Sequence, residues 1–344
     1  MITVLLTDGE FTGMIDSLRE RKDVRIIGFC FSDKAAHIAM LDKAYIAPLW
    51  DDPDYISFIC DVVRKEHVDF IFPVVTKSLP LMASAADEIK QKTGAVVVIS
   101  SSQSVSTANN KAELFKALKN NPTTSEYITG FDVVSSVREL KDKLKVPSAV
   151  KPVVGENKEG FVIAVSDDVW EKAVLSGNAD GLVCPSLLDL CDDGSCFEEK
   201  RLIMSYLPGQ EWDADLLVID GRIISATVRK NLGMTGGLSA CSETCNEPRI
   251  IEACERIVKA LGLEYISCIS FKEDEGGNIK LLEINPRTMG SIYISAMGGN
   301  NLATRLLSIL TCESSDMDLR LTPPGITASL FYDLAKVPNK ENEQ

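Results

Sequence analysis

Along the first hundred residues, the hydrophobic and polar positions follow two patterns, one typical of strands and one typical of helices. Short apolar runs rich in β-branched residues are typical of buried strands. These runs lie at residues 2–7, 24–29, 69–75 and 95–100. The segments between them carry apolar residues at helical spacing, at residues 14–22, 54–67 and 79–94. Strands that alternate with helices predict a parallel sheet with helices on both faces.

A polar stretch at 100–110 marks a boundary between the N-terminal unit and the middle of the chain. An amphipathic segment at 111–121 predicts a helix. Apolar segments at 147–154 and 161–166 predict two strands separated by a glycine-containing turn, and a further strand is expected at 201–207.

The final third has the pattern of antiparallel strand pairs. One pair turns at Asp220-Gly221, a dipeptide that favours the two-residue hairpin turn. A second pair turns at Gly276-Gly277, and an amphipathic helix is expected between the two pairs, at 247–262. This third is therefore expected to be α+β.

The fold class predicted for the whole chain is α/β and α+β. A parallel α/β domain at 1–107 precedes a small subdomain at 108–204 and a C-terminal α+β subdomain with an antiparallel sheet at 205–336. The polar residues 337–344 are expected to form a mobile tail. The turn after the first apolar run lacks the GxGxxG spacing, which disfavours a dinucleotide site.

Composition and charge narrow the function classes. The chain has 344 residues, of which 45% are hydrophobic and 25% charged, as in a globular protein with a sizeable core. Fifty acidic against 36 basic residues give a net charge of −14, and such a surface repels nucleic-acid phosphates. Because no apolar stretch approaches the roughly 18 residues of a membrane span and the N-terminus lacks a basic leader, we expect a cytoplasmic protein without a membrane partner.

The ten cysteines and two histidines give a weak chemical signal. Most cysteines, such as Cys30 and Cys268, lie in apolar runs and are expected to be small buried hydrophobes. His37 and His67 favour surface or structural roles. Five further cysteines could in principle surround a metal ion, but they lack a CxxC pair, which disfavours zinc. These five are Cys184, Cys191, Cys196, Cys241 and Cys245.

The segment KLLEINPRTMGS, residues 280–291, carries the strongest chemical signal. Glu283 and Asn285 are two apart on a predicted strand, so their side chains project from one face. A carboxylate beside an amide oxygen suits magnesium that bridges nucleotide phosphates. Arg287 continues this face, and its guanidinium matches phosphate oxygens. An ordinary edge strand with a charged face is the competing interpretation of these three residues alone.

Two other segments add candidate nucleotide contacts. In AVKPVVGENKEG, residues 149–160, Lys151 lies in an apolar strand and needs an anionic partner. Gly155 and Gly160 bracket a turn whose backbone amides could approach phosphates. Many strand–turn–strand segments have no such role.

The strand that leads into Ser205, Tyr206 and Leu207 offers backbone donors and acceptors before Pro208 interrupts the ladder. Adenine can be recognised by such a backbone edge. Glu211 follows shortly after and could accept hydrogen bonds from ribose hydroxyls, although a solvated carboxylate in a turn is the commoner case.

The order of Asn110-Lys111, Val150-Lys151-Pro152, LIMSYLPGQE and LLEINPR resembles the ATP-grasp superfamily. The resemblance is closest to the branch with carbamoyl-phosphate synthase large-subunit domains and carboxylate–amine ligases, and covers about residues 1–310. It implies the ATP-grasp fold, in which an N-terminal α/β domain, a mobile lid and a C-terminal domain hold ATP between the last two parts.

Carried over to this chain, the resemblance implies that Lys111 and Lys151 bind the nucleotide. Residues Gly155 to Gly160 would form the loop over the phosphates. The adenine edge would be Ser205, Tyr206 and Leu207, and Glu211 would lie near the ribose.

The resemblance also implies the catalytic and metal residues. Arg229 would face the transferred phosphoryl group, and Arg287 would lie beside the γ-phosphate. Glu283 and Asn285 would be ligands of Mg²⁺, or of Mn²⁺ in its place. The partners would be a small-molecule carboxylate and an amine, and a homodimer is an open option.

The chain departs from the family pattern at three places. Ser270 occupies a position where relatives have an acidic or amide metal ligand, so either a neighbour supplies the oxygen or one metal is weakly held or lost. Asn157 and Lys158 replace small residues in the lid loop. Lys77 lies on the expected substrate side where relatives often have Glu, which suggests an anionic substrate.

The function implied is ATP-dependent ligation. A carboxylate would be activated as an acyl phosphate and then attacked by an amine, with release of ADP and phosphate. Two alternatives remain open: an ATP-grasp kinase that phosphorylates a small molecule, and a non-catalytic ATP-binding protein, which Ser270 favours.

Overall fold

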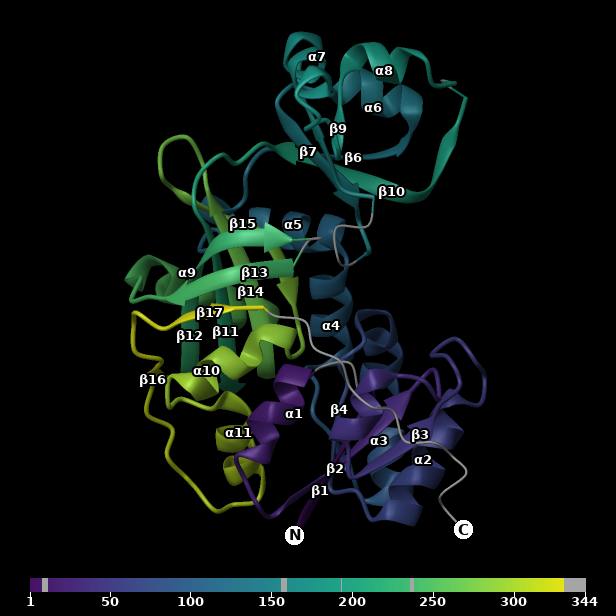
Figure 1. Cartoon of the computed structure of the whole chain (residues 1–344), viewed down its shortest axis with the longest axis vertical. Helices are drawn as coiled ribbons and strands as arrows, with labels where there is room; N and C mark the ends of the chain where they lie inside the picture. Colours follow the sequence, from purple (N-terminus) through teal and green to yellow (C-terminus); the bar gives the residue numbers. More distant parts are fainter. Residues whose placement is uncertain (8–11, 156–159, 193, 236–237, 331–344) are drawn as a thin grey trace.

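Three sheets, stacked along the long axis of the molecule, organise the chain (Figure 1). We describe a computed structural model that covers residues 1–344 except 8–11, 156–159, 193, 236–237 and 331–344. The predicted tail at 337–344 and the lid residues Asn157 and Lys158 lie outside the described residues. Within the described part, no helix is both long and apolar enough to cross a membrane.

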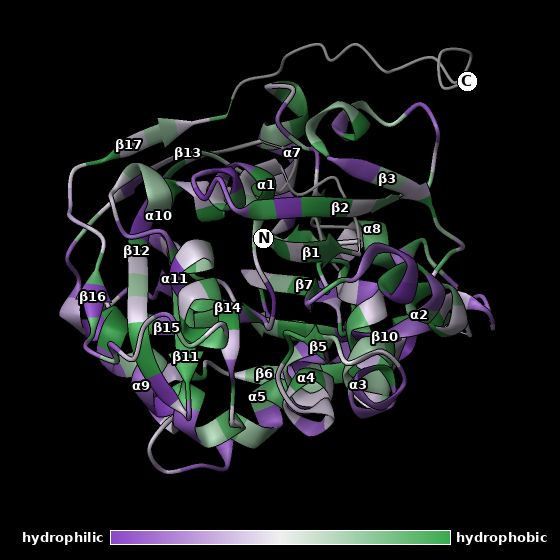
Figure 2. Ribbon diagram, turned by 90° about the horizontal axis from the view of Figure 1, so that it is seen from below, coloured by the Kyte–Doolittle hydropathy of each residue, from purple (hydrophilic) through white to green (hydrophobic). Residues whose placement is uncertain are grey.

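The N-terminal sheet is parallel, as its alternating sequence pattern predicts, and has the order β3-β2-β1-β4-β5. Its strands are β1 (Ile2–Leu6), β2 (Val24–Cys30), β3 (Lys43–Ile46), β4 (Phe70–Phe72) and β5 (Val96–Val97). In Figure 2, β1 and β5 have the hydrophobic colour over most of their length. Side chains on both faces of this sheet are therefore expected to be covered.

Helices cover the two faces of this sheet. Alternate residues of β1 point to opposite faces: Leu5 packs with α2 (Tyr55–Glu66) and α3 (Leu79–Thr93). Val4 packs on the other side with α1 (Thr12–Arg19), within a core that also contains residues of the C-terminal sheet. The N-terminal unit is thus joined to the C-terminal sheet by a shared hydrophobic core.

Most of the polar stretch at 100–110 forms the helix α4 (Ser102–Asn109), which links the N-terminal sheet to the rest of the chain (Figure 1). Ser101 caps α4 by accepting a hydrogen bond from the backbone N–H of Ser104. The predicted helix that follows is α5 (Lys111–Lys119), and the Asn110 side chain caps it in the same way. The cap places Lys111 in the first turn of α5.

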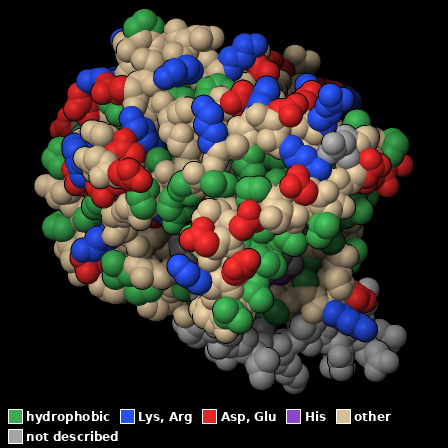
Figure 3. Space-filling view, turned by 90° about the horizontal axis from the view of Figure 1, so that it is seen from above, with side chains coloured by type: hydrophobic (Ala, Val, Ile, Leu, Met, Phe, Trp, Pro, Cys, Tyr) green, Lys and Arg blue, Asp and Glu red, His purple; other side chains and the backbone are tan. Residues whose placement is uncertain are grey.

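The second sheet has the order β6-β10-β7-β8-β9 and lies farthest from the N-terminal unit, within the segment predicted to be the lid (Figure 1). Its strands are β6 (Phe131–Ser136), β7 (Ser148–Pro152), β8 (Val162–Ala164), β9 (Leu182–Val183) and β10 (Cys196–Ser205). The helices α6 (Val137–Lys143), α7 (Asp167–Leu175) and α8 (Pro185–Asp189) lie beside it. Seen from the lid end, the surface carries side chains of both charges among hydrophobic ones (Figure 3).

The third sheet has seven strands in the order β15-β14-β11-β12-β13-β17, with β16 paired to β12. The strands are β11 (Glu211–Ile219), β12 (Arg222–Thr235), β13 (Leu238–Thr244), β14 (Tyr265–Glu273), β15 (Ile279–Asn285), β16 (Arg320–Leu321) and β17 (Thr327–Ser329). The β11–β12 turn has positive φ at Asp220 and Gly221, as the hairpin prediction requires. The antiparallel C-terminal sheet is confirmed.

The two faces of this sheet differ in polarity. On β11, Trp212, Ala214 and Leu216 point into a hydrophobic core shared with α5 and α9 (Pro248–Leu261). The alternate residues Asp213 and Asp215 point to the opposite face. That polar face carries the candidate site. The helices η4 (Gly290–Ile292), α10 (Tyr293–Met297) and α11 (Leu302–Leu310) follow β15.

Candidate active site

Three predicted site residues meet where β7, α5 and β15 converge. The Lys111 ammonium lies 3.6 Å from Glu283 Oε2 and donates a hydrogen bond of 3.0 Å to the carbonyl oxygen of Gly155. Lys151 Nζ donates a 2.7 Å hydrogen bond to the carbonyl oxygen of Leu282, next to Glu283. Side chains 132 and 172 positions apart from Glu283 are thus brought to one point, where their positive charges could meet phosphates.

Lys151 is buried, with 8% of its surface exposed, and its ammonium lies 5.7 Å from the centre of the Phe115 ring. Burial lowers the pKa of Lys151 to about 8, although the carboxylate of Glu283 opposes this shift. The charge of Lys111 lowers the same pKa further. An incoming anion would favour the charged form of Lys151.

Glu283 has 40% of its side chain exposed, so its carboxylate is paired with Lys111 and still accessible to solvent. Its removal from water raises its pKa, but Lys111 and Lys151 outweigh this, and the net pKa is lowered. Asn285 Nδ2 donates a 3.3 Å hydrogen bond to Glu283 Oε1, which places both side chains on one face as predicted. An ionised carboxylate beside an amide oxygen fits magnesium shared with nucleotide phosphates.

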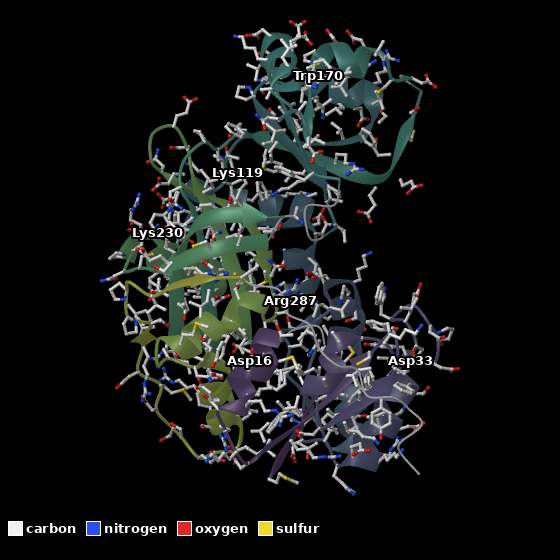
Figure 4. All side chains as sticks on the ribbon, in the orientation of Figure 1. Asp16, Asp33, Lys119, Trp170, Lys230 and Arg287 are labelled. Atoms are coloured by element: carbon white, nitrogen blue, oxygen red, sulfur yellow. The ribbon has the colours of Figure 1, made fainter. Side chains whose placement is uncertain are left out.

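Arg287 lies between the C-terminal sheet and the N-terminal unit (Figure 4). Its Nε donates a 2.9 Å hydrogen bond to Thr76 Oγ1, and its Nη1 donates one of 2.8 Å to the carbonyl oxygen of Thr288. Thr76 begins η2 (Thr76–Ser78), which is separated from the carboxyl end of β4 by residues 73–75. The sequence predicted Arg287 as a site residue but gave no signal for its contact with Thr76.

The predicted adenine edge begins where the lid strand β10 ends. Ser205 N donates a 3.0 Å hydrogen bond to the carbonyl oxygen of Gly130, and Leu207 is buried while Tyr206 is half-buried. Glu211 lies 3.6 Å from Lys272 Nζ and accepts a 3.2 Å hydrogen bond from Asn231 Nδ2. The roles of these residues toward adenine and ribose stay predictions.

The predicted phosphate loop is described at its two ends. The Gly155 carbonyl accepts from Lys111, and the Gly160 carbonyl accepts a 3.2 Å hydrogen bond from Arg201 Nη1. Gly160 has φ of 65°, a conformation that favours glycine. The loop residues between them, including Lys158, lie outside the described residues.

Arg229 is held between two carboxylates on the polar face of the C-terminal sheet. Its side chain is 1% exposed; Nη1 donates to Asp215 Oδ2, and Nη2 donates to Asp213 Oδ2 at 3.1 Å. Burial lowers the pKa of Arg229, but the two carboxylates raise it more, so the guanidinium is charged. Burial raises the pKa of Asp215 despite the opposing charge of Arg229. The predicted role toward a phosphoryl group stays a prediction.

Ser270 lies directly opposite Glu283 in the β14–β15 register and opposite Asp213 in the β11–β14 register. Its Oγ donates a 2.6 Å hydrogen bond to Asp213 Oδ1. Asp213 and Asp215 were not among the predicted site residues. Their signal was present, because two carboxylates alternate with apolar residues in the strand segment WDADLLVI.

Lys77 extends over an aromatic ring at the carboxyl edge of the N-terminal sheet. Its Nζ lies 5.8 Å from the centre of the Trp50 ring, and Trp50 packs edge-on against Phe31. Lys77 directly follows Thr76, the residue bonded to Arg287. This location borders the site, on the side where the sequence suggested an anionic substrate.

The cysteines form no alternative metal centre within the described residues. All ten are free thiols, and no group of three or more His, Cys, Asp or Glu side chains in the described ranges is arranged to hold a metal ion. His37 is buried beside Cys30, with 3.1 Å between Nε2 and Sγ, in keeping with a structural role.

Comparisons with known proteins point to one superfamily. Residues 197–327 match the family model described as ATP-grasp in the biosynthetic pathway with Ter operon, and residues 7–99 match the PylC-like N-terminal domain. Carnosine synthase 1 of Gallus gallus is 33% identical over 102 residues, which is 27% of this chain and 11% of that protein. The match therefore spans about a tenth of this curated relative.

Solved structures share the fold over most of the chain. The ADP complex of N5-carboxyaminoimidazole ribonucleotide synthetase has a TM-score of 0.67 at 14% identity and covers 94% of this chain and 80% of that one. L-amino acid ligase from Bacillus licheniformis has a TM-score of 0.66 at 17% identity and covers 89% and 73%. The chain thus has the ATP-grasp fold, and its residues 197–327 match an ATP-grasp family model.

Proposed function

We propose that this protein is an ATP-dependent ligase that activates a carboxylate as an acyl phosphate for attack by an amine. The observation that carries the proposal is the convergence of Lys111, Lys151 and Glu283 at the end of β15. One carboxylate neutralises only one of the two ammonium groups, so a positive charge is left over. This arrangement suits a triphosphate with its metal better than it suits a structural ion pair.

The chemistry assigned to the chain's own residues is electrostatic. A carboxylate oxygen of the substrate attacks the γ-phosphorus, and the bond from that phosphorus to the β–γ bridging oxygen breaks, giving ADP. Lys111, Lys151 and Arg287 offset the negative charge that gathers in this step. The amine then attacks the acyl carbon, phosphate leaves, and the amine's surplus proton passes to solvent.

Magnesium, or manganese, would be held by Glu283 and Asn285 and would supply charge neutralisation for the phosphates. The accessible Glu283 carboxylate and the adjacent Asn285 amide support this assignment. Magnesium usually takes one or two protein carboxylates together with substrate phosphates, so this small donor set is sufficient.

The names of similar proteins support a carboxylate–amine ligase. One of these proteins is named a carnosine synthase and another an L-amino acid ligase. We extend this activity class to the chain as a proposal, together with a cytoplasmic location. The narrower carbamoyl-phosphate synthase-like assignment remains a prediction. One structural neighbour is a biotin carboxylase domain dimer, which supports a homodimer as a proposal.

Lys77 supports an anionic carboxylate substrate. Its ammonium extends over Trp50 at the edge of the N-terminal sheet, where ligands of open α/β sheets commonly bind. The neighbouring Thr76 contacts Arg287, so an anion at Lys77 would lie beside the proposed phosphoryl-transfer point.

A non-catalytic ATP-binding protein is the second candidate, and Ser270 favours it because a hydroxyl is a weaker magnesium ligand than a carboxylate. A phosphate-release screen over pairs of carboxylates and amines, followed by mass spectrometry, separates the candidates. A ligase yields ADP, phosphate and a condensed product, whereas a kinase leaves phosphate on its acceptor. ATP binding without turnover across the panel would contradict the ligase and favour the binder.

A further inference from the structure

Four side chains form a row across four neighbouring strands on the polar face of the C-terminal sheet. Arg229 of β12 pairs in register with Asp213 of β11, Asp213 with Ser270 of β14, and Ser270 with Glu283 of β15. Residues directly opposite in an antiparallel ladder point to the same face. The row therefore runs from the buried guanidinium to the exposed carboxylate of the proposed metal site.

Asp213 is not needed to neutralise Arg229. Asp215 already pairs with this guanidinium and supplies one negative charge, and its side chain is 2% exposed. Asp213 adds a second negative charge to one positive charge, and its side chain is 11% exposed. A surplus carboxylate that is mostly removed from water is costly unless a cation lies nearby.

The two carboxylate oxygens of Asp213 accept hydrogen bonds from different sides. Oδ2 accepts from Arg229 Nη2 at 3.1 Å and from Asn231 Nδ2 at 3.0 Å. Oδ1 accepts from Ser270 Oγ at 2.6 Å, on the side of Glu283. Because the Ser270 hydroxyl donates its proton to Asp213, its oxygen lone pairs remain available to a cation on the Glu283 side.

We propose that Asp213 is a positioning residue that supplies, through Ser270, the second negative charge of the divalent-metal site at Glu283. The carboxylate expected on β14 is thus carried by the next strand, and Ser270 acts as the oxygen that connects it to the metal. This inference rests on the proposed ATP-dependent function, since the metal would be bound together with nucleotide.

Mn²⁺ binding to the full-length protein saturated with ADP tests this arrangement, with free Mn²⁺ measured by electron paramagnetic resonance. Asp213→Asn keeps the shape of the side chain and leaves Arg229 paired with Asp215. We expect it to weaken Mn²⁺ binding about tenfold, and Ser270→Ala to weaken it severalfold. The double variant D213N/S270D moves the carboxylate to β14 and should restore binding to within about threefold of the original.

Asp61→Asn serves as the control for net charge, because Asp61 is 78% exposed on α2, and it should bind Mn²⁺ like the original protein. Unchanged Mn²⁺ affinity in both Asp213→Asn and Ser270→Ala, with a loss in Glu283→Gln, would overturn this inference and leave the proposed function intact. Failure of the original protein to bind ADP with Mn²⁺ would overturn both. If Asp213→Asn does not fold, Ser270→Ala and the double variant still decide the question.

Discussion

Arg287 of the C-terminal part donates a hydrogen bond from Nε to the hydroxyl of Thr76, a residue 211 positions earlier in the chain. Thr76 follows β4 of the N-terminal sheet, and its carbonyl oxygen also accepts a 3.1 Å hydrogen bond from Asn109 Nδ2 of α4. The orientation of a proposed catalytic guanidinium thus depends on a residue of a different sheet. Thr76 is a positioning residue for Arg287.

Thr76→Val should lower kcat of the ligase reaction about tenfold or more, because a hydrogen bond to a charged group contributes about 1.5–3 kcal/mol. KM for ATP should change little, since the substitution leaves the charge of Arg287 in place. Steady-state kinetics with an identified substrate pair provide the measurement. Thr76→Ser retains the hydroxyl and should recover most of the rate; equal losses in both variants would argue against this role.

Glu283→Ala and Arg287→Ala should each reduce turnover by about a hundredfold or more, because both remove charge stabilisation at the transferring phosphoryl group. Phosphate release under saturating ATP measures this effect. Arg256→Ala, which changes a 37% exposed residue on α9, is the matched control and should retain activity. Near-original turnover in either site variant would exclude the assigned role.

Arg229→Met should lower the free energy of unfolding by about 3–5 kcal/mol, because it leaves two buried carboxylates without their cation. Urea denaturation followed by circular dichroism tests this. Lys230→Met is the neighbouring control: Lys230 pairs with Glu243 at 34% and 31% exposure, and its loss should cost less than about 1 kcal/mol. Similar midpoints for the two variants would contradict the prediction.

Nucleotide affinity should fall as pH rises through about 8, because Lys151 loses its proton there in the free protein. The stability of the nucleotide-free protein should respond in the opposite sense. Burial lowers the pKa of Lys151 below its ordinary value of 10.5, so between about 8 and 10.5 the unfolded chain binds more protons, and the contribution of Lys151 to stability rises with pH.

Calorimetric titration with Mg·ADP at pH 7, 8 and 9 measures this dependence, with Lys151→Met as the comparison. The variant should bind more weakly at pH 7 and lose most of the dependence between pH 7 and 9. An identical pH profile in both proteins would show that another group titrates.

The regular elements could be predicted from the sequence wherever burial imposed a period. The parallel N-terminal strands and the hairpin turn at Asp220-Gly221 are confirmed. The strands β3 and β13 were missed for a physical reason: Lys43–Ile46 is half-exposed, and Leu238–Thr244 is largely polar. Both segments are strands because they form backbone hydrogen bonds with a neighbouring strand. Local sequence propensity does not encode such pairing.

The site was predictable only in part. Glu283 and Asn285 share a strand, so their common face follows from their spacing alone. The contacts of Thr76 with Arg287 and of Ser270 with Asp213 join distant segments, and they depend on sheet packing and strand register. A single sequence contains no direct signal for such pairings, so these two contacts could not be anticipated.

The row from Arg229 to Glu283 restricts where residues can be inserted into the hairpins that contain these side chains. Side chains alternate between faces, so one extra residue inside β11 would turn Asp213 toward the hydrophobic core and bring Ala214 onto the polar face. Insertions at the tips, such as at Gly276-Gly277, leave the paired segments unshifted. Homologues that diversify by insertion should therefore vary at the tips of these hairpins and keep a constant number of residues within the strands between Arg229 and Glu283.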